Sequence, residues 1–234
     1  MGERPGQALR RRPLHFIWIA DCSGSMMADG KIQALNNAIR ETIPHLRDVA
    51  AQNPFAELLV RAVSFSTDVR WHIPTPTPVE QLVWPDLGAG GYTRMGTALA
   101  TVAEALKVPP MEPRSLRPAL VLISDGQPTD DFETGLSRLM AEPWGAKAVR
   151  LAVAIGRDAD QRVLERFIAH PEIKPALAHN PEQLTQFIRW ASTVASRVAS
   201  TPRPVPGPGG EPPPQVPVPG PPPPSGPDPL GLTW

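Results

Sequence analysis

Three segments of the chain carry oxygen-bearing side chains in patterns that suit a hard metal ion. The first is Asp21-Cys22-Ser23-Gly24-Ser25, in which a carboxylate and two hydroxyls alternate through a turn. The second is a glycine-rich loop that ends in a threonine, and the third is an aspartate followed by glycine. Carboxylate and hydroxyl oxygens suit Mg²⁺, Mn²⁺ or Ca²⁺, whereas zinc favours nitrogen and sulfur. The candidate metal ligands are Asp21, Ser23, Ser25, Thr93 and Asp125.

The elements around these residues predict that they meet at one edge of a sheet. Short apolar runs of strand length alternate with segments whose apolar residues recur three or four positions apart. Strands are expected at 14–20, 58–65, 69–73, 119–124, 149–155 and 176–179. This alternation predicts an α/β fold: a doubly wound, mostly parallel sheet with one antiparallel edge strand at 69–73 and helices on both faces. Ligands of such sheets bind beyond the carboxyl ends of the strands, where Asp21 and Asp125 are expected.

Glycine and proline add three local predictions. Gly24 is expected to adopt unusual backbone angles that turn several oxygens toward one point, and Gly90 and Gly91 are expected to let Thr93 approach in the same way. Pro44 falls inside the first helical segment, where it predicts a kink or a local break.

The order of these motifs resembles a known family. Asp21-x-Ser23-x-Ser25, the glycine-flanked Thr93 and the strand-terminal Asp125-Gly126 are similar to the metal-ion-dependent adhesion site (MIDAS) of von Willebrand factor A (VWA) domains. Segments 125–131, 154–160 and 187–190 resemble the bacterial branch related to the tellurium-resistance TerY proteins. The likeness covers about 14–199. It implies that the two serines and Thr93 contact the metal directly or nearly so, and that Asp21 and Asp125 act largely through water.

The resemblance implies a non-enzymatic, cytoplasmic interaction module. Neutral direct ligands would leave the cation able to accept an Asp or Glu carboxylate from a protein partner. Mg²⁺ is the favoured ion, with Mn²⁺ and Ca²⁺ as alternatives. The TerY-like branch implies a Ser/Thr kinase and a PP2C-type phosphatase as partners in tellurite or stress signalling. Tyr92 and Arg94 flank Thr93 and are either rim residues for that partner or ordinary loop residues.

Other interpretations of the same residues stay open. Asp21 at a strand end could be the aspartyl nucleophile of an Mg²⁺-dependent hydrolase of the phosphatase type, although the haloacid-dehalogenase pattern needs a second Asp where Ser23 stands. A metal-independent scaffold is a third class. The first motif could also be a turn that caps a helix near Lys31. Asp130 and Asp131 could add acidity near the metal or cap the helix from Phe132.

Composition limits the remaining function classes. With 234 residues, 41% of them hydrophobic, and no net charge, the chain fits one α/β domain plus an appendage. Its scattered charges do not predict a nucleic-acid surface, and no apolar run approaches the roughly 20 residues of a membrane span. Cys22, the single cysteine, is compatible with a reducing compartment and is expected to be a small buried residue.

The expected domains are a flexible N-terminus at 1–13, a VWA domain at 14–199 and a proline-rich, disordered tail at 200–234. Proline accounts for 32 residues of the chain, and the tail that holds many of them lacks hydrophobic periodicity. Such a segment favours polyproline II or disorder. It is either a spacer or a ligand, for a proline-binding module or through its end at Leu230 to Trp234.

Overall fold

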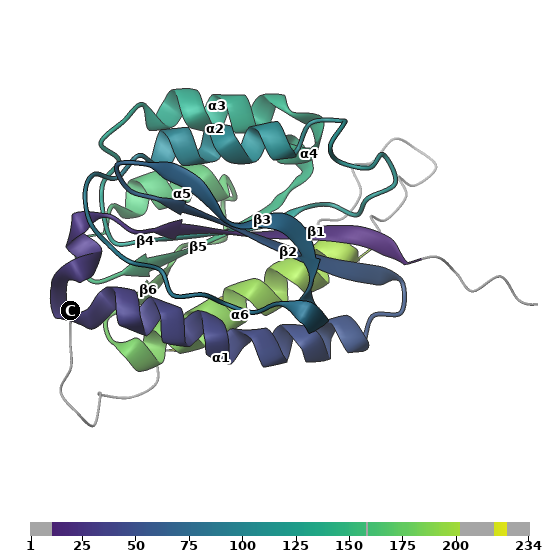
Figure 1. Cartoon of the computed structure of the whole chain (residues 1–234), viewed down its shortest axis with the longest axis horizontal. Helices are drawn as coiled ribbons and strands as arrows, with labels where there is room; N and C mark the ends of the chain where they lie inside the picture. Colours follow the sequence, from purple (N-terminus) through teal and green to yellow (C-terminus); the bar gives the residue numbers. More distant parts are fainter. Residues whose placement is uncertain (1–10, 158, 202–217, 224–234) are drawn as a thin grey trace, which may run out of the picture.

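A computed structural model describes residues 11–157, 159–201 and 218–223 of the chain, which form a sheet covered by helices (Figure 1). The six strands are β1 (Arg12–Asp21), β2 (Ala56–Phe65), β3 (Val69–Pro78), β4 (Ala119–Ser124), β5 (Val149–Ile155) and β6 (Ala176–Ala178). Their order in the sheet is β3-β2-β1-β4-β5-β6. Every neighbouring pair is parallel except β2 and β3. The predicted doubly wound, mostly parallel sheet with one antiparallel edge strand is confirmed.

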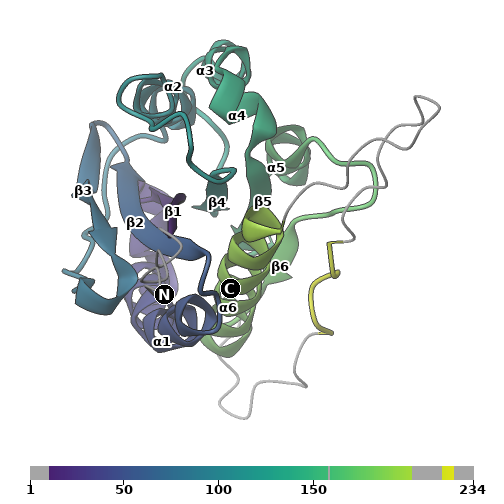
Figure 2. The same ribbon diagram turned by 90° about the vertical axis from the view of Figure 1, so that its right-hand side faces the viewer.

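Helices cover both faces of this sheet (Figures 1 and 2). One face packs against α1 (Lys31–Ala51) and α6 (Pro181–Ser200), and the other packs against α2 (Met95–Ala105), α3 (Phe132–Ala141) and α5 (Gln161–Ile168). Three short helical elements join them: η1 (Gly24–Gly30), η2 (Val79–Gln81) and α4 (Pro143–Lys147). Because successive strand residues point to opposite faces, Phe16 and Trp18 enter one core while Ile17 and Ile19 enter the other.

Trp18 ties the central strand to α6. Its side chain is fully buried, and the indole Nε1 donates a hydrogen bond to Ser192 Oγ at 3.1 Å. Its ring meets Phe16 and Trp84 edge-on, at centroid distances of 5.0 and 5.6 Å. The carboxyl end of β1, where Asp21 lies, is therefore held against a rigid layer.

Proline positions account for two differences from the predicted elements. β3 continues past Ile73 to Pro78 because it is an edge strand, where a missing N–H need not leave a gap in the ladder. α1 runs from Lys31 to Ala51 without a break at Pro44, because packing against the sheet and α6 holds the helix. Of the two effects predicted for Pro44, a kink or a local break, the break is wrong.

The ends of the chain are described only in part. β1 begins at Arg12, two residues before the predicted strand, and most of the expected N-terminal segment 1–13 lies outside the described residues. Of the proline-rich tail at 200–234, only 200, 201 and 218–223 are described, so Leu230 to Trp234 also fall outside. No helix within the described ranges is long and apolar enough to cross a membrane.

Candidate metal centre

Asp21 is the innermost residue of the candidate site. It ends β1 and is fully buried. One carboxylate oxygen accepts the backbone N–H of Ser23 at 2.8 Å, and the other accepts the hydroxyl of Ser124 at 2.5 Å. Ser124 ends the neighbouring strand β4, so the parallel pairing of β1 and β4 brings the two groups together. These bonds fix the orientation of the carboxylate.

A chain of polar contacts leads from Ser23 to a lysine. Ser23 Oγ lies 3.0 Å from Ser25 Oγ, and the Ser25 hydroxyl donates to Asp125 Oδ1 at 2.7 Å. Lys31 Nζ, from the first turn of α1, donates to the other oxygen of Asp125 at 2.8 Å. The Asp125 side chain is fully buried in this ion pair, and the Lys31 side chain is only 12% exposed. A cationic group thus already neutralises one of the two carboxylates.

Thr93 is brought in by a tightly bound loop. Gly24 N–H donates to Gly91 O at 3.0 Å, and Gly90 N–H donates to Cys22 O at 2.8 Å, so the loop lies along the first motif. Gly91 has φ 83°, and a side chain there would collide with the Thr67 hydroxyl. The prediction that Gly90 and Gly91 adopt special backbone angles is confirmed.

The expectation for Gly24 is wrong, because its φ is not positive. Glycine is needed there for space instead: a Cβ on Gly24 would lie 3.3 Å from the Gly91 carbonyl oxygen. The close approach of the two loops, and not a left-handed turn, accounts for the residue.

Gly126 marks the point on which the oxygens converge. A methyl carbon placed on Gly126 would lie 3.6 Å from Thr93 Oγ1, 3.7 Å from Ser25 Oγ and 3.9 Å from Asp21 Oδ2. Ser23 and Asp125 join this group through their contacts with Ser25. The structure therefore brings all five candidate ligands together, from three separate segments of the chain.

The electrostatics of the group favour a cation. The pKa of Asp21 is raised to about 6, mainly by burial and to a smaller extent by the charge of Asp125, while hydrogen bonds from Ser124 and Ser23 lower it. Among the described residues, no basic side chain forms an ion pair with Asp21. A buried carboxylate without a cationic partner is stabilised when a metal ion binds beside it.

Helix capping does not account for the first motif. Ser23 precedes η1 but makes no side-chain capping bond, and the residue before α1 is Gly30. Asp131 caps α3 by accepting the Thr134 N–H at 3.0 Å, as the capping alternative predicts. Asp130 caps α2 instead, because its carboxylate accepts the N–H groups of Gly96 and Thr97 at 2.8 and 2.7 Å.

Comparison with known families identifies the fold. A family model of the von Willebrand factor type A domain matches residues 17–189. The chain belongs to the VWA family. Domains of this family typically mediate protein–protein interactions and often bind a divalent cation at the MIDAS. No curated protein matches the chain.

Solved structures resemble the VWA domain at low identity. A von Willebrand factor type A protein from Catenulispora acidiphila is 20% identical with a TM-score of 0.58, covering 80% of this chain and 43% of that one. The ArnB paralog VWA2 from Sulfolobus acidocaldarius is 18% identical with a TM-score of 0.53, covering 76% and 44%.

The third is proximal thread matrix protein 1 from the mussel byssus, solved with a zinc-occupied MIDAS motif. It is 18% identical with a TM-score of 0.59, covering 78% of this chain and 48% of that one. The chain thus spans less than half of each of these three proteins, and at this identity the likeness concerns the fold.

The rim of the VWA domain's candidate site is exposed. Tyr92 is 63% exposed and Arg94 is exposed, on either side of the buried Thr93. Met27, from η1, is 66% exposed. The two predicted rim residues therefore face solvent, where a partner could reach them.

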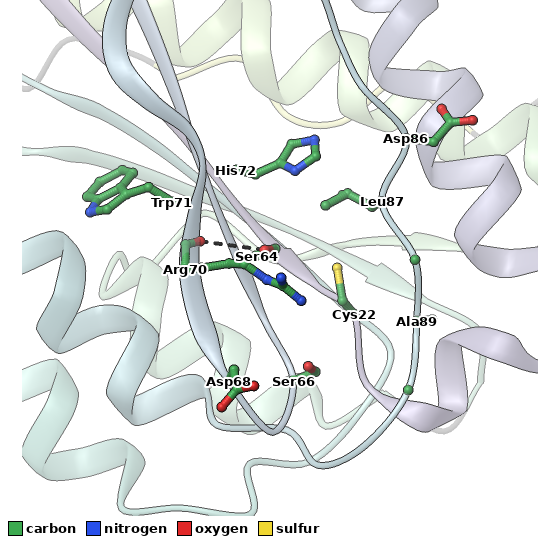
Figure 3. A pocket seen from close by; sticks show the side chains of 12 residues that line it. Cys22, Ser64, Ser66, Asp68, Arg70, Trp71, His72, Asp86, Leu87 and Ala89 are labelled. Atoms are coloured by element: carbon green, nitrogen blue, oxygen red, sulfur yellow. Dashed lines mark hydrogen bonds between the residues drawn. The ribbon is translucent and has the colours of Figure 1, made fainter.

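A polar pocket of about 480 Å³ adjoins the site between β3 and the loop before α2 (Figure 3). Cys22 lines it together with Ser64, Arg70 and His72. Burial, helped by the charge of Asp21, raises the pKa of the Cys22 thiol to about 12. At neutral pH the thiol is protonated, in agreement with a small buried residue and not with an activated nucleophile.

Sequence reasoning assigned no role in the site to Lys31, Ser124 or Gly126, although Gly126 belongs to the Asp125-Gly126 motif. Ser124 and Gly126 flank Asp125 in the chain, and that adjacency was a usable signal. Lys31 gave no comparable signal, because a lysine in the first turn of a helix is ordinary and its partner is 94 residues away.

Proposed function

We propose that the VWA domain binds one divalent cation through Asp21, Ser23, Ser25, Thr93 and Asp125, and that the cation holds a carboxylate of a protein partner. The observation that carries this proposal is the convergence of Thr93 Oγ1, Ser25 Oγ and Asp21 Oδ2 around Gly126. Five oxygen-bearing side chains from three loops meet there, and the distances among them leave a place that suits one small cation.

The chemistry of the donors supports a hard cation. The group offers hydroxyl and carboxylate oxygens, and in the portions of the chain that are described no cluster of three or more His, Cys, Asp or Glu competes with it. Mg²⁺ is the favoured ion, with Mn²⁺ and Ca²⁺ as alternatives. Because the mussel byssus protein carries zinc in its MIDAS, zinc belongs among the ions tested.

Few negative charges would surround the bound cation. Three of the five side chains are neutral, and Lys31 offsets part of the charge of Asp125. When bound, the cation supplies a Lewis-acidic contact for an Asp or Glu side chain of the partner. Tyr92 and Arg94 lie on the exposed rim and would contact the rest of that partner.

The resemblance to the TerY-like branch extends the proposal. It points to a cytoplasmic, non-enzymatic adaptor in tellurite or stress signalling, with a Ser/Thr kinase or a PP2C-type phosphatase as the partner. The proposed role is adhesion and not catalysis. The thiol of Cys22 is protonated at neutral pH, so it is not an activated nucleophile, which agrees with this role.

Partner capture with matched variants tests the proposal. Wild-type protein, Asp21→Ala and the exposed control Glu57→Ala are incubated with a lysate in Mg²⁺ or in chelator, after circular dichroism has shown that each is folded. We expect one set of partners to be retained by wild type and Glu57→Ala in Mg²⁺ only. If partner capture is unchanged by the chelator and by Asp21→Ala, the partner does not bind through the metal site, and the metal-independent scaffold is favoured.

A further inference from the structure

A groove runs between α1 and α6, on the helical layer that Figure 1 shows below the sheet. Its volume is about 490 Å³. The α1 side is lined by His45, Val49 and Gln52, and the α6 side by Trp190 and Thr193. The groove is distinct from the candidate metal centre, because it shares no residue with it.

A piece of the proline-rich tail already forms part of the wall of this groove. Pro222 lines it, and Gln186 of α6 donates through Nε2 to the carbonyl oxygen of Pro223 at 3.3 Å. Val218 packs against the core layer formed by α1 and α6. Within 218–223, Val218 and Pro222 are half-buried while the other four residues are exposed. Two anchoring side chains and one backbone contact therefore hold the segment.

The walls of the groove have the chemistry that polyproline segments need. A polyproline II helix makes no internal hydrogen bonds, so its carbonyl oxygens are free to accept hydrogen bonds from a partner, and its proline rings pack on aromatic side chains. Trp190 supplies an aromatic ring, while its buried Nε1 donates to no acceptor in the described ranges, 218–223 included. Gln186 supplies the hydrogen-bond donor.

We propose that the α1/α6 groove is a polyproline-binding site whose occupant is residues 218–223 of the same chain. Tethering raises the local concentration of a segment to the order of millimolar, so a weak intrinsic affinity is enough to fill the groove in cis. The tail is then neither a plain spacer nor a free ligand: it is a ligand of its own domain, and it covers a surface that another proline-rich segment could bind only in competition.

Peptide competition on the full chain tests this. The double substitution Pro222→Gly, Pro223→Gly opens the groove, and a synthetic peptide of residues 216–225 is titrated while the Trp190 indole N–H resonance is followed by NMR. We expect the peptide to shift this resonance in the double variant and to bind wild type at least tenfold more weakly, because residues 218–223 cover part of the groove in wild type. Trp190→Phe and Trp190→Ala lack this resonance, so peptide binding to them is measured by isothermal titration calorimetry; Phe, which keeps a ring, is expected to retain binding, and Ala to abolish it.

Three results would overturn the proposal: no peptide binding to the opened groove, binding that is the same after Trp190→Ala, or equal binding to wild type and the double variant. Analytical ultracentrifugation of wild type tests whether the segment binds the groove of a second copy instead. A concentration-dependent dimer that the double variant does not form would show that it does. A peptide with alanine at every proline is the negative control. The thermal response to Mg²⁺ is measured on each variant, so a damaged fold is recognised separately.

Discussion

Replacing Asp21 with asparagine should stabilise the metal-free domain while removing its response to metal. Asp21 is fully buried and pairs with no basic side chain among the described residues. Its pKa is about 6 in the folded chain against an ordinary value of 3.8. Because the pKa is raised on folding, the stabilising contribution is fully present below pH 3.8 and is lost as the pH rises through about 6.

The size of the effect follows from these pKa values. At roughly 1.4 kcal/mol per pH unit, the difference corresponds to about 3 kcal/mol of unfolding free energy lost at neutral pH. Asparagine keeps an acceptor for the Ser124 hydroxyl or the Ser23 N–H but carries no charge. In chelator at pH 7.5, Asp21→Asn should therefore be more stable than wild type by about 2 to 3 kcal/mol, and the difference should vanish near pH 4.

Urea unfolding followed by tryptophan fluorescence measures this directly. With Mg²⁺ or Mn²⁺ at about 1,000 times its dissociation constant the order should reverse, because the ion then adds roughly 4.1 kcal/mol to wild type and nothing to the variant. Asp48→Asn, an exposed carboxylate on α1, controls for the loss of one charge. If Asp21→Asn is the less stable protein in chelator at pH 7.5, or if the difference does not change with pH, the buried charge is not the destabilising feature inferred here.

Three further substitutions probe neighbouring residues. Gly126→Ala places a methyl 3.6 to 3.9 Å from three site oxygens at an ordinary φ, so calorimetry should show Mn²⁺ binding lost while the melting temperature in chelator stays near that of wild type. Lys31→Met removes the ion pair with Asp125 and leaves that carboxylate free for the metal ion, so Mn²⁺ should bind roughly threefold to tenfold tighter. The unfolding free energy of the metal-free domain, measured with urea, should fall by about 1 to 2 kcal/mol. Weaker Mn²⁺ binding would show that Lys31 supports the site. Asp130→Ala removes the cap of α2 and should cost about 1 to 2 kcal/mol in the same assay, with weaker Mn²⁺ binding because Thr93 precedes that helix; unchanged stability would contradict the capping role.

The sequence alone determined the architecture and the set of candidate ligands. Apolar runs that alternate with helical periodicity report burial, and burial on both faces is what a parallel sheet between two helical layers requires. Because parallel strands end at the same edge, a carboxylate after each of two strands was enough to predict that Asp21 and Asp125 meet. Chain order and hydrophobic pattern are local properties, so they can be read without coordinates.

Tertiary structure decided what surrounds those ligands. The ion pair of Lys31 with Asp125 and the bond from Ser124 to Asp21 join residues 94 and 103 positions apart, and no local pattern reports side-chain directions over such separations. The same holds for the role of Gly24, which depends on another loop, and for the continuity of α1 at Pro44, which packing enforces against local preference. The position of Pro222 at the groove between α1 and α6 is a further case, because a proline-rich segment has no hydrophobic periodicity from which its contact surface could be predicted.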